Sequence, residues 1–467
     1  MIKKNDEYEL VIDDIGSEGE GIGHIDSETG HAGKYALFVK DALPGDRVLV
    51  KVMKTKKTYG YARLLKILEP SDDRVEPRCS LARQCGGCQL QHLSYEKQLE
   101  YKVNKIKNCL ERIGGYTREI IEDIMEPIIG MDEPYYYRNK AQFPVGMDKE
   151  GNIITGFYAG RTHSIIDMDH CYIQNPVNEE LLVIIKGFMK EFGIEPYQEE
   201  ADSGLIRHIL TRIGHRTGEI MVCLIINGNK LPHSQELVDR LQKINGMTSI
   251  SLNVNKNRTN VILGEKVVTL WGQDYITDYI GDVKYRISPL SFYQVNPIQT
   301  GKLYDTALEY AGLHGEEVVW DIYCGIGTIS LFLAQKAKQV YGVEIVPQAI
   351  EDARVNAAIN GIENAEFFTG AAEVVLPEKY RESRDAMRAD VIVVDPPRKG
   401  CDEAVLDTIV RLEPKRVVYV SCDPATLARD VKYMRERGYE MVRVRGCDMF
   451  PGTVHIECVV KLCRVRK

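Results

Sequence analysis

The feature that most constrains the fold of this chain is a glycine-rich turn between a predicted strand and a predicted helix. Residues 318–323 form an apolar run rich in strand formers, residues 324–328 include two glycines, and a helical pattern begins at Ile329. Glycines allow the backbone to turn tightly and to come close to a ligand. This arrangement predicts the first unit of an open α/β sheet that binds a nucleotide-type cofactor.

Three more predicted strands follow this turn, at residues 339–343, 389–394 and 417–420. Ligands bind at the carboxyl ends of the strands in open α/β sheets. The side chains at or just beyond the four strand ends are Tyr323, Glu344, Asp395 and Cys422. An acidic residue such as Glu344, about 20 residues beyond the turn, can accept hydrogen bonds from ribose hydroxyls. The third glycine of the dinucleotide fingerprint is missing, which favours a nucleoside cofactor such as S-adenosylmethionine over a pyrophosphate.

Cys422 lies between a predicted strand and the start of a predicted helix, in the segment Ser421-Cys422-Asp423-Pro424. The first turn of a helix has unpaired N–H groups and the positive end of the helix dipole, and both favour a thiolate. A free cysteine has a pKa of about 8.5, so we expect a lowered pKa and a reactive thiol here. A buried structural cysteine is the alternative for an isolated segment of this kind.

Short strand patterns separated by glycine turns occupy residues 7 to 64, which predicts a small β-barrel. The chain has a net charge of −8, which is unusual for a protein that binds RNA. Local basic clusters are nevertheless compatible with a structured RNA partner. These clusters are Lys51, Lys54, Lys56 and Lys57 in the barrel region, and Arg207, Arg212 and Arg216 in mid-chain. A structural barrel without a ligand is the alternative.

Three cysteines with the spacing C-x5-C-x2-C occur at Cys79, Cys85 and Cys88. Thiolates in such a group bind zinc or an iron–sulfur cluster. A disulfide is disfavoured because the chain shows no secretory signal. A fourth ligand is needed, and Cys171, beside His170, is the best candidate. The residues alone leave zinc and iron–sulfur open.

The other segments indicate organisation rather than chemistry. Residues 94–113 have the period of one amphipathic helix, and a mixed α/β region without a catalytic constellation follows. The longest wholly apolar run, Ile220–Ile226, is far too short to span a membrane. The charged N-terminal residues are unlike a secretory signal, so we expect a cytoplasmic protein.

Five segments, in their order along the chain, closely resemble the motifs of the RNA (uracil-5-)-methyltransferases. They are Ser291-Phe292-Tyr293-Gln294-Val295-Asn296, Asp321-Ile322-Tyr323-Cys324-Gly325-Ile326-Gly327-Thr328, Asp395-Pro396-Pro397-Arg398, Ser421-Cys422-Asp423-Pro424 and His455-Ile456-Glu457. The resemblance extends over essentially the whole chain. The barrel pattern and the cysteine group are similar to the branch that carries a TRAM domain and an iron–sulfur cluster and acts on 23S ribosomal RNA.

The resemblance implies a multidomain α/β protein. It has a Rossmann-like class I methyltransferase domain, an N-terminal OB-like TRAM barrel that binds RNA, and a central α+β domain. The implied bounds are 1–64 for the barrel, 65–93 and 126–284 for the central domain with the cluster, and 94–125 and 285–467 for the methyltransferase domain. The implied cofactors are S-adenosylmethionine and a [4Fe–4S] cluster whose ligands are Cys79, Cys85, Cys88 and Cys171.

The resemblance also implies a reaction. A thiolate of Cys422 adds to carbon 6 of uracil, and the enolate that results takes the methyl group at carbon 5. Glu457 then removes the proton from carbon 5, and Phe292 stacks on the flipped base. The residues implied in cofactor binding are Gln294, Tyr323, Glu344 and Asp395, of which Asp395 can also contact the uracil.

Several alternatives follow from the same sequence. Within the enzyme class, the alternative substrate is a uridine of the transfer RNA T-loop rather than one of 23S ribosomal RNA. A non-catalytic RNA-binding or ribosome assembly factor needs neither Cys422 nor Glu457. An iron–sulfur redox enzyme needs a flavin or nicotinamide fingerprint, and none accompanies the cysteines. We expect a monomer that binds RNA and no membrane.

Overall fold

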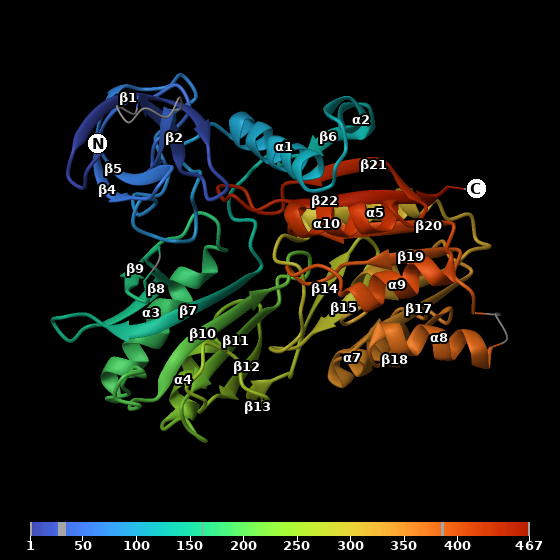
Figure 1. The fold of residues 1–467 in the computed structure, drawn as a ribbon. Coiled ribbons are helices and arrows are strands. Elements are labelled where there is room, and N and C mark those ends of the chain that lie inside the picture. Colours follow the sequence, from blue (N-terminus) through green and yellow to red (C-terminus); the bar gives the residue numbers. More distant parts are fainter. Residues whose placement is uncertain (1, 27–33, 161, 384–386, 466–467) are drawn as a thin grey trace. The chain divides into compact units, whose positions relative to one another are not determined.

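The computed structural model describes residues 2–26, 34–160, 162–383 and 387–465 (Figure 1). The chain forms two compact units. The first is built from Met1–Lys105, Tyr158–Thr162 and Phe450–His455. The second is built from Ile106–Phe157, His163–Met449 and Ile456–Lys467. Among the described residues, no helix is both long and apolar enough to cross a membrane.

The N-terminal strands close into a barrel, which confirms the prediction for this region. Its strands are β1 (Glu7–Ile15), β2 (Gly21–Asp26), β3 (Lys34–Lys40), β4 (Arg47–Thr55) and β5 (Tyr59–Glu69), in the order β1-β2-β3-β5-β4. Alternate side chains point inward, as the two-residue period of a strand requires, and Leu37, Val48 and Val50 are fully buried. Closure leaves no unpaired sheet edge.

A buried carboxylate holds the turn between β3 and β4. Asp46 accepts hydrogen bonds from the main-chain N–H of Leu43, at 2.7 Å, and of Ser71, at 2.9 Å. Arg74 forms an ion pair with it, and the Asp46 side chain is fully buried. Because a buried charge is costly unless it is paired and hydrogen-bonded, Asp46 ties the turn to the segment that leaves the barrel.

Two helices connect the barrel region to the sheets. They are α1 (Tyr95–Arg112) and α2 (Arg118–Ile124). The bounds of α1 agree closely with the helix predicted over 94–113. Ile106 and Leu110, near its C-terminal end, belong to the buried cluster formed by the strands of the large sheet in the second unit.

A seven-stranded sheet forms one half of the second unit, in the order β13-β12-β11-β10-β7-β8-β9. Its strands are β7 (Lys140–Met147), β8 (Ile153–Tyr158), β9 (Ile165–Asp167), β10 (Ile206–Ile213), β11 (Ile220–Ile226), β12 (Met247–Val254) and β13 (Lys266–Gly272). Helices α3 (Val177–Glu191) and α4 (Ser234–Leu241) pack together, and α4 contacts β12 and β13. A hairpin of β14 (Ile276–Ile280) and β15 (Val283–Ile287) follows.

An eight-stranded sheet forms the other half, in the order β18-β17-β16-β19-β20-β22-β21-β6. Its strands are β6 (Met125–Ile129), β16 (Val318–Ile322), β17 (Gln339–Glu344), β18 (Ala365–Thr369), β19 (Val391–Val394), β20 (Arg416–Ser421), β21 (Tyr439–Cys447) and β22 (Glu457–Arg464). The strands β16 to β20 are parallel, and β22 is antiparallel to β20. The predicted boundary between residues 125 and 126 falls inside β6.

Helices cover both faces of this sheet. They are α5 (Pro297–Ala311), α6 (Thr328–Ala334), α7 (Pro347–Ile359), α8 (Ala372–Glu382), α9 (Glu403–Leu412) and α10 (Pro424–Arg435). The first three contact one another in sequence, as do the last three, and each set packs on the strands. Parallel strands with helices on both faces are the Rossmann-like, three-layer arrangement that the sequence predicts.

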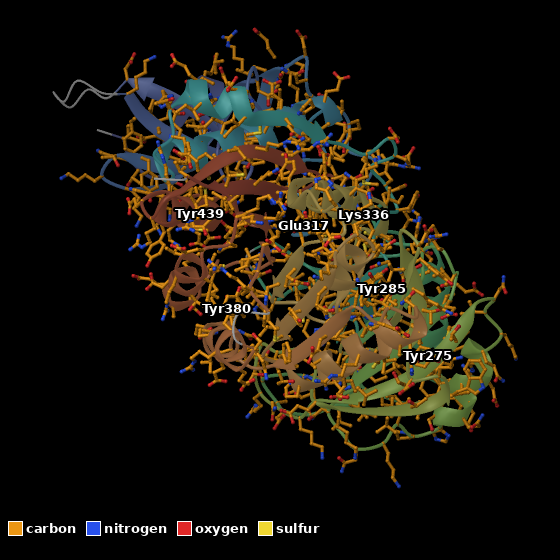
Figure 2. All side chains as sticks on the ribbon, turned by 90° about the vertical axis from the view of Figure 1, so that its right-hand side faces the viewer. Tyr275, Tyr285, Glu317, Lys336, Tyr380 and Tyr439 are labelled. Atoms are coloured by element: carbon orange, nitrogen blue, oxygen red, sulfur yellow. The ribbon has the colours of Figure 1, made fainter. Side chains whose placement is uncertain are left out.

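Buried tyrosines tie the connections of this half to its core (Figure 2). The hydroxyl of Tyr285 donates to the carbonyl oxygen of Thr328 at 2.9 Å, where α6 begins. The hydroxyl of Tyr439 donates to the carbonyl oxygen of Pro414 at 3.0 Å, and that of Tyr380 accepts from the N–H of Ala389 at 2.6 Å. Each bond satisfies a polar group that the core would otherwise leave unpaired.

Candidate active site at the strand ends

The predicted site residues come together at one edge of the eight-stranded sheet. Parallel strands end at the same edge. Tyr323 and Asp395 follow β16 and β19 there, and Glu344 is the last residue of β17. Cys422 follows β20 directly. Because β22 is antiparallel to β20 and Cys458 pairs with Ser421, Glu457 begins β22 at this same edge.

The thiol of Cys422 is half-buried, and its protonation differs from the prediction. Burial, followed by the charges of Glu457 and Asp395, raises the pKa of Cys422 to about 12. The direction of this shift is opposite to the lowered pKa that the sequence predicted. The first turn of α10 is capped by a different residue: the Asp423 side chain accepts hydrogen bonds from the N–H groups of Ala425, at 2.9 Å, and Thr426, at 3.1 Å. The N-terminus of α10 thus stabilises Asp423.

Glu457, which is buried, and Asp395, which is partly buried, form an acidic pair beside this thiol. Burial raises the pKa of Asp395 to about 7. Burial and then the charge of Asp395 raise the pKa of Glu457 well above its usual value, while Arg398 opposes this shift. Glu457 is 3% exposed. Two carboxyl groups so close retain a proton more readily than either one alone.

Glu344 ends β17 and faces the glycine-rich turn. Its carboxylate accepts hydrogen bonds from the N–H of Gly325 at 3.3 Å and of Val346 at 3.0 Å. Gly325 has a φ of +54°, and a Cβ atom there would meet nothing within 4 Å. The next residue, Ile345, is 68% exposed. The turn therefore leaves open space next to a carboxylate and an exposed apolar side chain.

Tyr323 follows β16 and contacts the loop that follows Asp395. Its backbone is in the left-handed region, with a φ of +71°, which is strained for a tyrosine. Its hydroxyl forms a hydrogen bond with the thiol of Cys401, in the loop that follows Asp395, and burial is the main cause that raises the pKa of Tyr323. Tyr323 thus links the glycine turn to that loop.

Gln294 lies in the loop before α5 and is 7% exposed. Its carbonyl oxygen accepts a hydrogen bond from the Asn139 side chain at 3.0 Å. In the same loop the side chain of Phe292 is 70% exposed, the largest value of any large apolar residue described. Ser291 is held by Ser288, whose hydroxyl lies 2.8 Å from that of Ser291. A rigid loop therefore presents an aromatic ring to solvent.

Two of the three mid-chain arginines are buried, whereas Arg216 is exposed. Arg207 and Arg212 are 7% and 2% exposed. The Arg207 guanidinium donates to the carbonyl oxygen of Asn255 at 2.9 Å, and the Arg212 guanidinium donates to that of Ser291. Both side chains hold loops against the seven-stranded sheet, so they contribute to structure.

The four predicted metal ligands are divided between the two units. Cys79, Cys85 and Cys88 belong to the first unit and Cys171 to the second. The N–H of Gly87 donates to the Cys85 sulfur at 3.4 Å. Burial raises the pKa of Cys85, and the charge of Cys79 adds to this. Within the described part of the chain, no three His, Cys, Asp or Glu side chains lie close enough together to hold a metal ion.

Two charged residues at this edge were missed as site residues. Asp321, near the end of β16, is 1% exposed, and its carboxylate accepts a hydrogen bond from the Ser330 hydroxyl at 2.5 Å. Burial, with smaller effects from Asp395 and Glu344, raises the pKa of Asp321 to about 7. Arg398 lowers the pKa values of both Cys422 and Glu457. The sequence signal that could have identified Arg398 as a site residue is its place in the segment Asp-Pro-Pro-Arg.

Comparison with known proteins identifies the family. Residues 94–465 match the model described as tRNA (uracil-5-)-methyltransferase, and residues 3–65 match the model of the TRAM domain. The chain belongs to the tRNA (uracil-5-)-methyltransferase family. The family model includes the whole strand-end site, and the second match lies on the closed barrel.

Relatives in this family extend over the full chain. An RNA methyltransferase of Halalkalibacterium halodurans is 54% identical over 462 residues, which are 99% of this chain and 98% of the relative. One of Clostridium acetobutylicum is 50% identical over 467 residues, 100% and 99% of the two chains. The solved tRNA (uracil-54, C5)-methyltransferase of Pyrococcus abyssi, in complex with S-adenosyl-L-homocysteine, has a TM-score of 0.76 and 30% identity, covering 97% of this chain and 99% of that chain.

Proposed function

We propose that this protein transfers the methyl group of S-adenosylmethionine to carbon 5 of a uridine in 23S ribosomal RNA, through a covalent bond between Cys422 and carbon 6. The observation that carries the proposal is the grouping of the Cys422 thiol with the Glu457 and Asp395 carboxyl groups at one sheet edge. A thiol beside a proton acceptor is the pairing that covalent addition requires.

The strand ends fit the proposed cofactor. Glu344 offers a carboxylate to ribose hydroxyls, and Gly325 leaves room for a ligand in front of the turn. Ile345 and Val346, 68% and 50% exposed, offer an apolar surface to the adenine ring. When bound, S-adenosylmethionine supplies an electrophilic methyl group. The acidic residues Asp321 and Asp395 favour a positively charged ligand at this edge.

The residues of the chain supply the other parts of the reaction. The Cys422 thiol gives its proton to Asp395, so that the carboxylate of Glu457 stays free to act as a base. The sulfur adds to carbon 6 of the uracil, which places the negative charge of an enolate on carbon 5. After carbon 5 is methylated, Glu457 takes the proton from that carbon. The carbon–sulfur bond then breaks, and the double bond between carbons 5 and 6 is restored. Arg398 is the cation that stabilises the negative charges of the thiolate and the carboxylates.

The barrel is proposed to bind the RNA chain. Three half-buried aromatic rings pack together on its outer surface, with centroid distances of 5.6 Å for Phe38–Tyr59, 5.7 Å for Phe38–Tyr61 and 5.8 Å for Tyr59–Tyr61. Lys54 pairs with Tyr61 across the strands, and it forms no ion pair with a described residue. Rings that stack on bases and cations that contact phosphates together bind single-stranded RNA. Weaker RNA binding by Tyr61→Ala, with unchanged cofactor binding, is the expected result; equal RNA binding would contradict it.

We also propose that Cys79, Cys85, Cys88 and Cys171 ligate a [4Fe–4S] cluster. The proposal is supported by the proximity of Cys79 to Cys85 and by the Gly87 N–H that faces the Cys85 sulfur. Hydrogen bonds of this kind stabilise thiolates bound to iron. The cluster has a structural role here, because methyl transfer to carbon 5 moves no electrons.

Two proposals differ in the RNA that the protein methylates. The TRAM barrel and the cysteine group favour 23S ribosomal RNA. The likeness to the archaeal enzyme, whose name states tRNA uracil-54, favours a T-loop uridine. Mass spectrometry of ribosomal and transfer RNA from a deletion strain decides between them: loss of 5-methyluridine from 23S RNA supports the first, loss from transfer RNA the second, and no loss from either contradicts both.

A further inference from the structure

A hydrogen-bonded clamp joins α10 to the loop that follows Asp395. The buried Asp430 carboxylate accepts the Cys401 N–H at 2.8 Å and the Tyr419 hydroxyl at 2.6 Å. Arg429 forms an ion pair with Asp430 at 2.7 Å. The same guanidinium donates to the carbonyl oxygens of Lys399, at 3.0 Å, and Cys401, at 3.3 Å. Two successive residues of α10 therefore make four hydrogen bonds to other segments and one ion pair with each other.

The loop lies against the helix so closely that only glycine fits at its turn. Gly400 has a φ of +78°, and a Cβ atom there would lie 2.6 Å from a guanidinium nitrogen of Arg429 and 2.7 Å from a carboxylate oxygen of Asp430. One turn earlier in α10, the Thr426 hydroxyl lies 3.2 Å from the carbonyl oxygen of Arg398. The clamp therefore extends to Arg398 itself.

The two segments joined by this clamp both belong to the strand-end site. Helix α10 begins two residues after Cys422, and the loop carries Arg398 between Asp395 and Gly400. Arg398 is the cation that lowers the pKa values of Cys422 and Glu457. Its side chain is exposed, so packing does not hold it in place. What fixes its main chain relative to Cys422 is the set of bonds from Thr426, Arg429 and Asp430.

The packing of α10 alone does not account for the charged side chain of Asp430. Asp430 is fully buried, whereas the Arg429 side chain that pairs with it is 53% exposed. A buried carboxylate costs free energy, and apolar residues of similar size serve helix packing at least as well. The bonds that Asp430 accepts go to the loop and to Tyr419, three residues before Cys422, which are the two segments that carry the reacting groups.

We propose that Asp430 and Arg429 are positioning residues for methyl transfer, which hold the loop 398–401 so that Arg398 stays beside Cys422 and Glu457. The proposal rests on the function proposed above for Cys422. Neither residue touches the reacting atoms. Their effect passes through Arg398, so it alters the reactivity of the thiol and leaves the cofactor contacts at Glu344 in place.

The test uses the full-length protein with Asp430→Asn and Arg429→Gln, and Lys432→Ala as the matched control. Lys432 is exposed on the same helix, outside the clamp. Both clamp variants should lower kcat, by about tenfold to a hundredfold, because small displacements of a catalytic group have effects of this size. The dissociation constant of S-adenosylhomocysteine should not change. Both variants should also slow the alkylation of Cys422 by iodoacetamide at pH 8, followed by mass spectrometry of the Cys422 peptide.

A double-mutant cycle with Arg398→Gln shows whether the effect passes through Arg398. If it does, Arg398→Gln combined with Arg429→Gln alkylates no more slowly than Arg398→Gln alone. Additive losses, or wild-type kcat in both clamp variants, would overturn the proposal. Because Arg429 is half-exposed, its variant keeps the test valid if Asp430→Asn does not fold. Alkylation needs no RNA, so it tests the clamp even if wild-type protein forms no adduct with 5-fluorouridine RNA, the result that would contradict the proposed function.

Discussion

Glu457 and Cys422 lie at the paired ends of β22 and β20, and burial together with the charge of this carboxyl group raises the pKa of the thiol. A nucleophile is usually activated by a lowered pKa or by an adjacent base. Here a carboxyl group lies beside the thiol, and the pKa of the thiol is raised rather than lowered. In the proposed mechanism, activation therefore takes place in the complex with RNA and cofactor, in which Asp395 accepts the proton of the thiol.

The first prediction concerns the reactivity of Cys422 without substrate. Because its pKa is about 12, its alkylation should accelerate by roughly tenfold for each pH unit between pH 7 and pH 10, with no plateau. Arg398→Gln removes the charge that lowers this pKa, so it should slow alkylation at pH 8 by roughly two- to fivefold, the range for exposed charges. The control is Lys399→Gln, since Lys399 pairs with Asp402 at 3.2 Å. A plateau below pH 8 would show that the thiolate is stabilised after all.

The second prediction concerns the cofactor. Glu344→Ala should weaken S-adenosylhomocysteine binding by about tenfold to a hundredfold, because it removes hydrogen bonds made to a charged group. RNA binding should be retained. Isothermal titration calorimetry measures the first quantity and filter binding the second. Glu351→Ala is the control, because this exposed residue pairs with Arg354 on α7. An unchanged dissociation constant would mean that the cofactor lies elsewhere.

The third prediction concerns metal. Freshly purified protein should be brown and contain iron and acid-labile sulfide, and Cys85→Ala should lose both. Cys463→Ala, on β22 and away from the C-x5-C-x2-C group, should retain them. Elemental analysis that found one zinc and no iron would contradict the cluster and leave the methyltransferase proposal intact.

The fourth prediction concerns the barrel. Arg74→Ala should destabilise it by about 3 kcal/mol, because it leaves the Asp46 carboxylate buried and unpaired. Burial opposes ionisation of Asp46, but its bonds to Arg74 and to main-chain N–H groups outweigh this and lower its pKa below 3.8. The stabilisation is therefore present above about pH 4 and is lost as the pH falls through the lowered pKa. Amide hydrogen exchange of β1 and β4 measures the effect.

The control for the barrel is Arg47→Ala. Arg47 is 47% exposed and pairs with Glu9 and Glu69 on the surface. Exposed pairs contribute about 1 kcal/mol or less, so hydrogen exchange in β1 and β4 should change little. Equal effects of Arg47→Ala and Arg74→Ala would show that burial of the Asp46 pair has no special importance.

The sequence predicts this fold well where local pattern and chain order agree. Each strand of the large sheet that was expected is present, because apolar runs followed by a turn and an amphipathic segment leave few alternatives. The barrel is predicted for the same reason. Residues at strand ends can be placed from sequence, since parallel strands end at one edge.

Properties that depend on packing between distant segments could not be predicted in the same way. The pKa of Cys422 depends on Glu457 and Asp395, which come from other strands, and on Asp423, whose side chain caps the helix. The sequence does not show what Asp430 pairs with, because its partners are in a loop and a strand that only the fold brings to α10. The burial of Arg212 likewise results from sheet register and from the loop at Ser291.

The last prediction tests the covalent mechanism and separates its two residues. Glu457→Gln keeps the shape of the side chain but cannot accept the proton from carbon 5. Addition and methylation should still occur with Asp395 as the proton acceptor for the thiol, and the reaction should stop before the carbon–sulfur bond breaks. Wild-type protein should form a comparable adduct only with 5-fluorouridine RNA, because fluorine cannot leave as a cation.

The most direct measurement is denaturing electrophoresis of Glu457→Gln, with and without Cys422→Ala, after incubation with unmodified substrate RNA and S-adenosylmethionine. The account predicts a slowly migrating protein–RNA adduct with Glu457→Gln, bound through the peptide that contains Cys422, and no adduct when Cys422→Ala is also present. Turnover of Glu457→Gln at the wild-type rate, or an adduct that persists in the double variant, would contradict it.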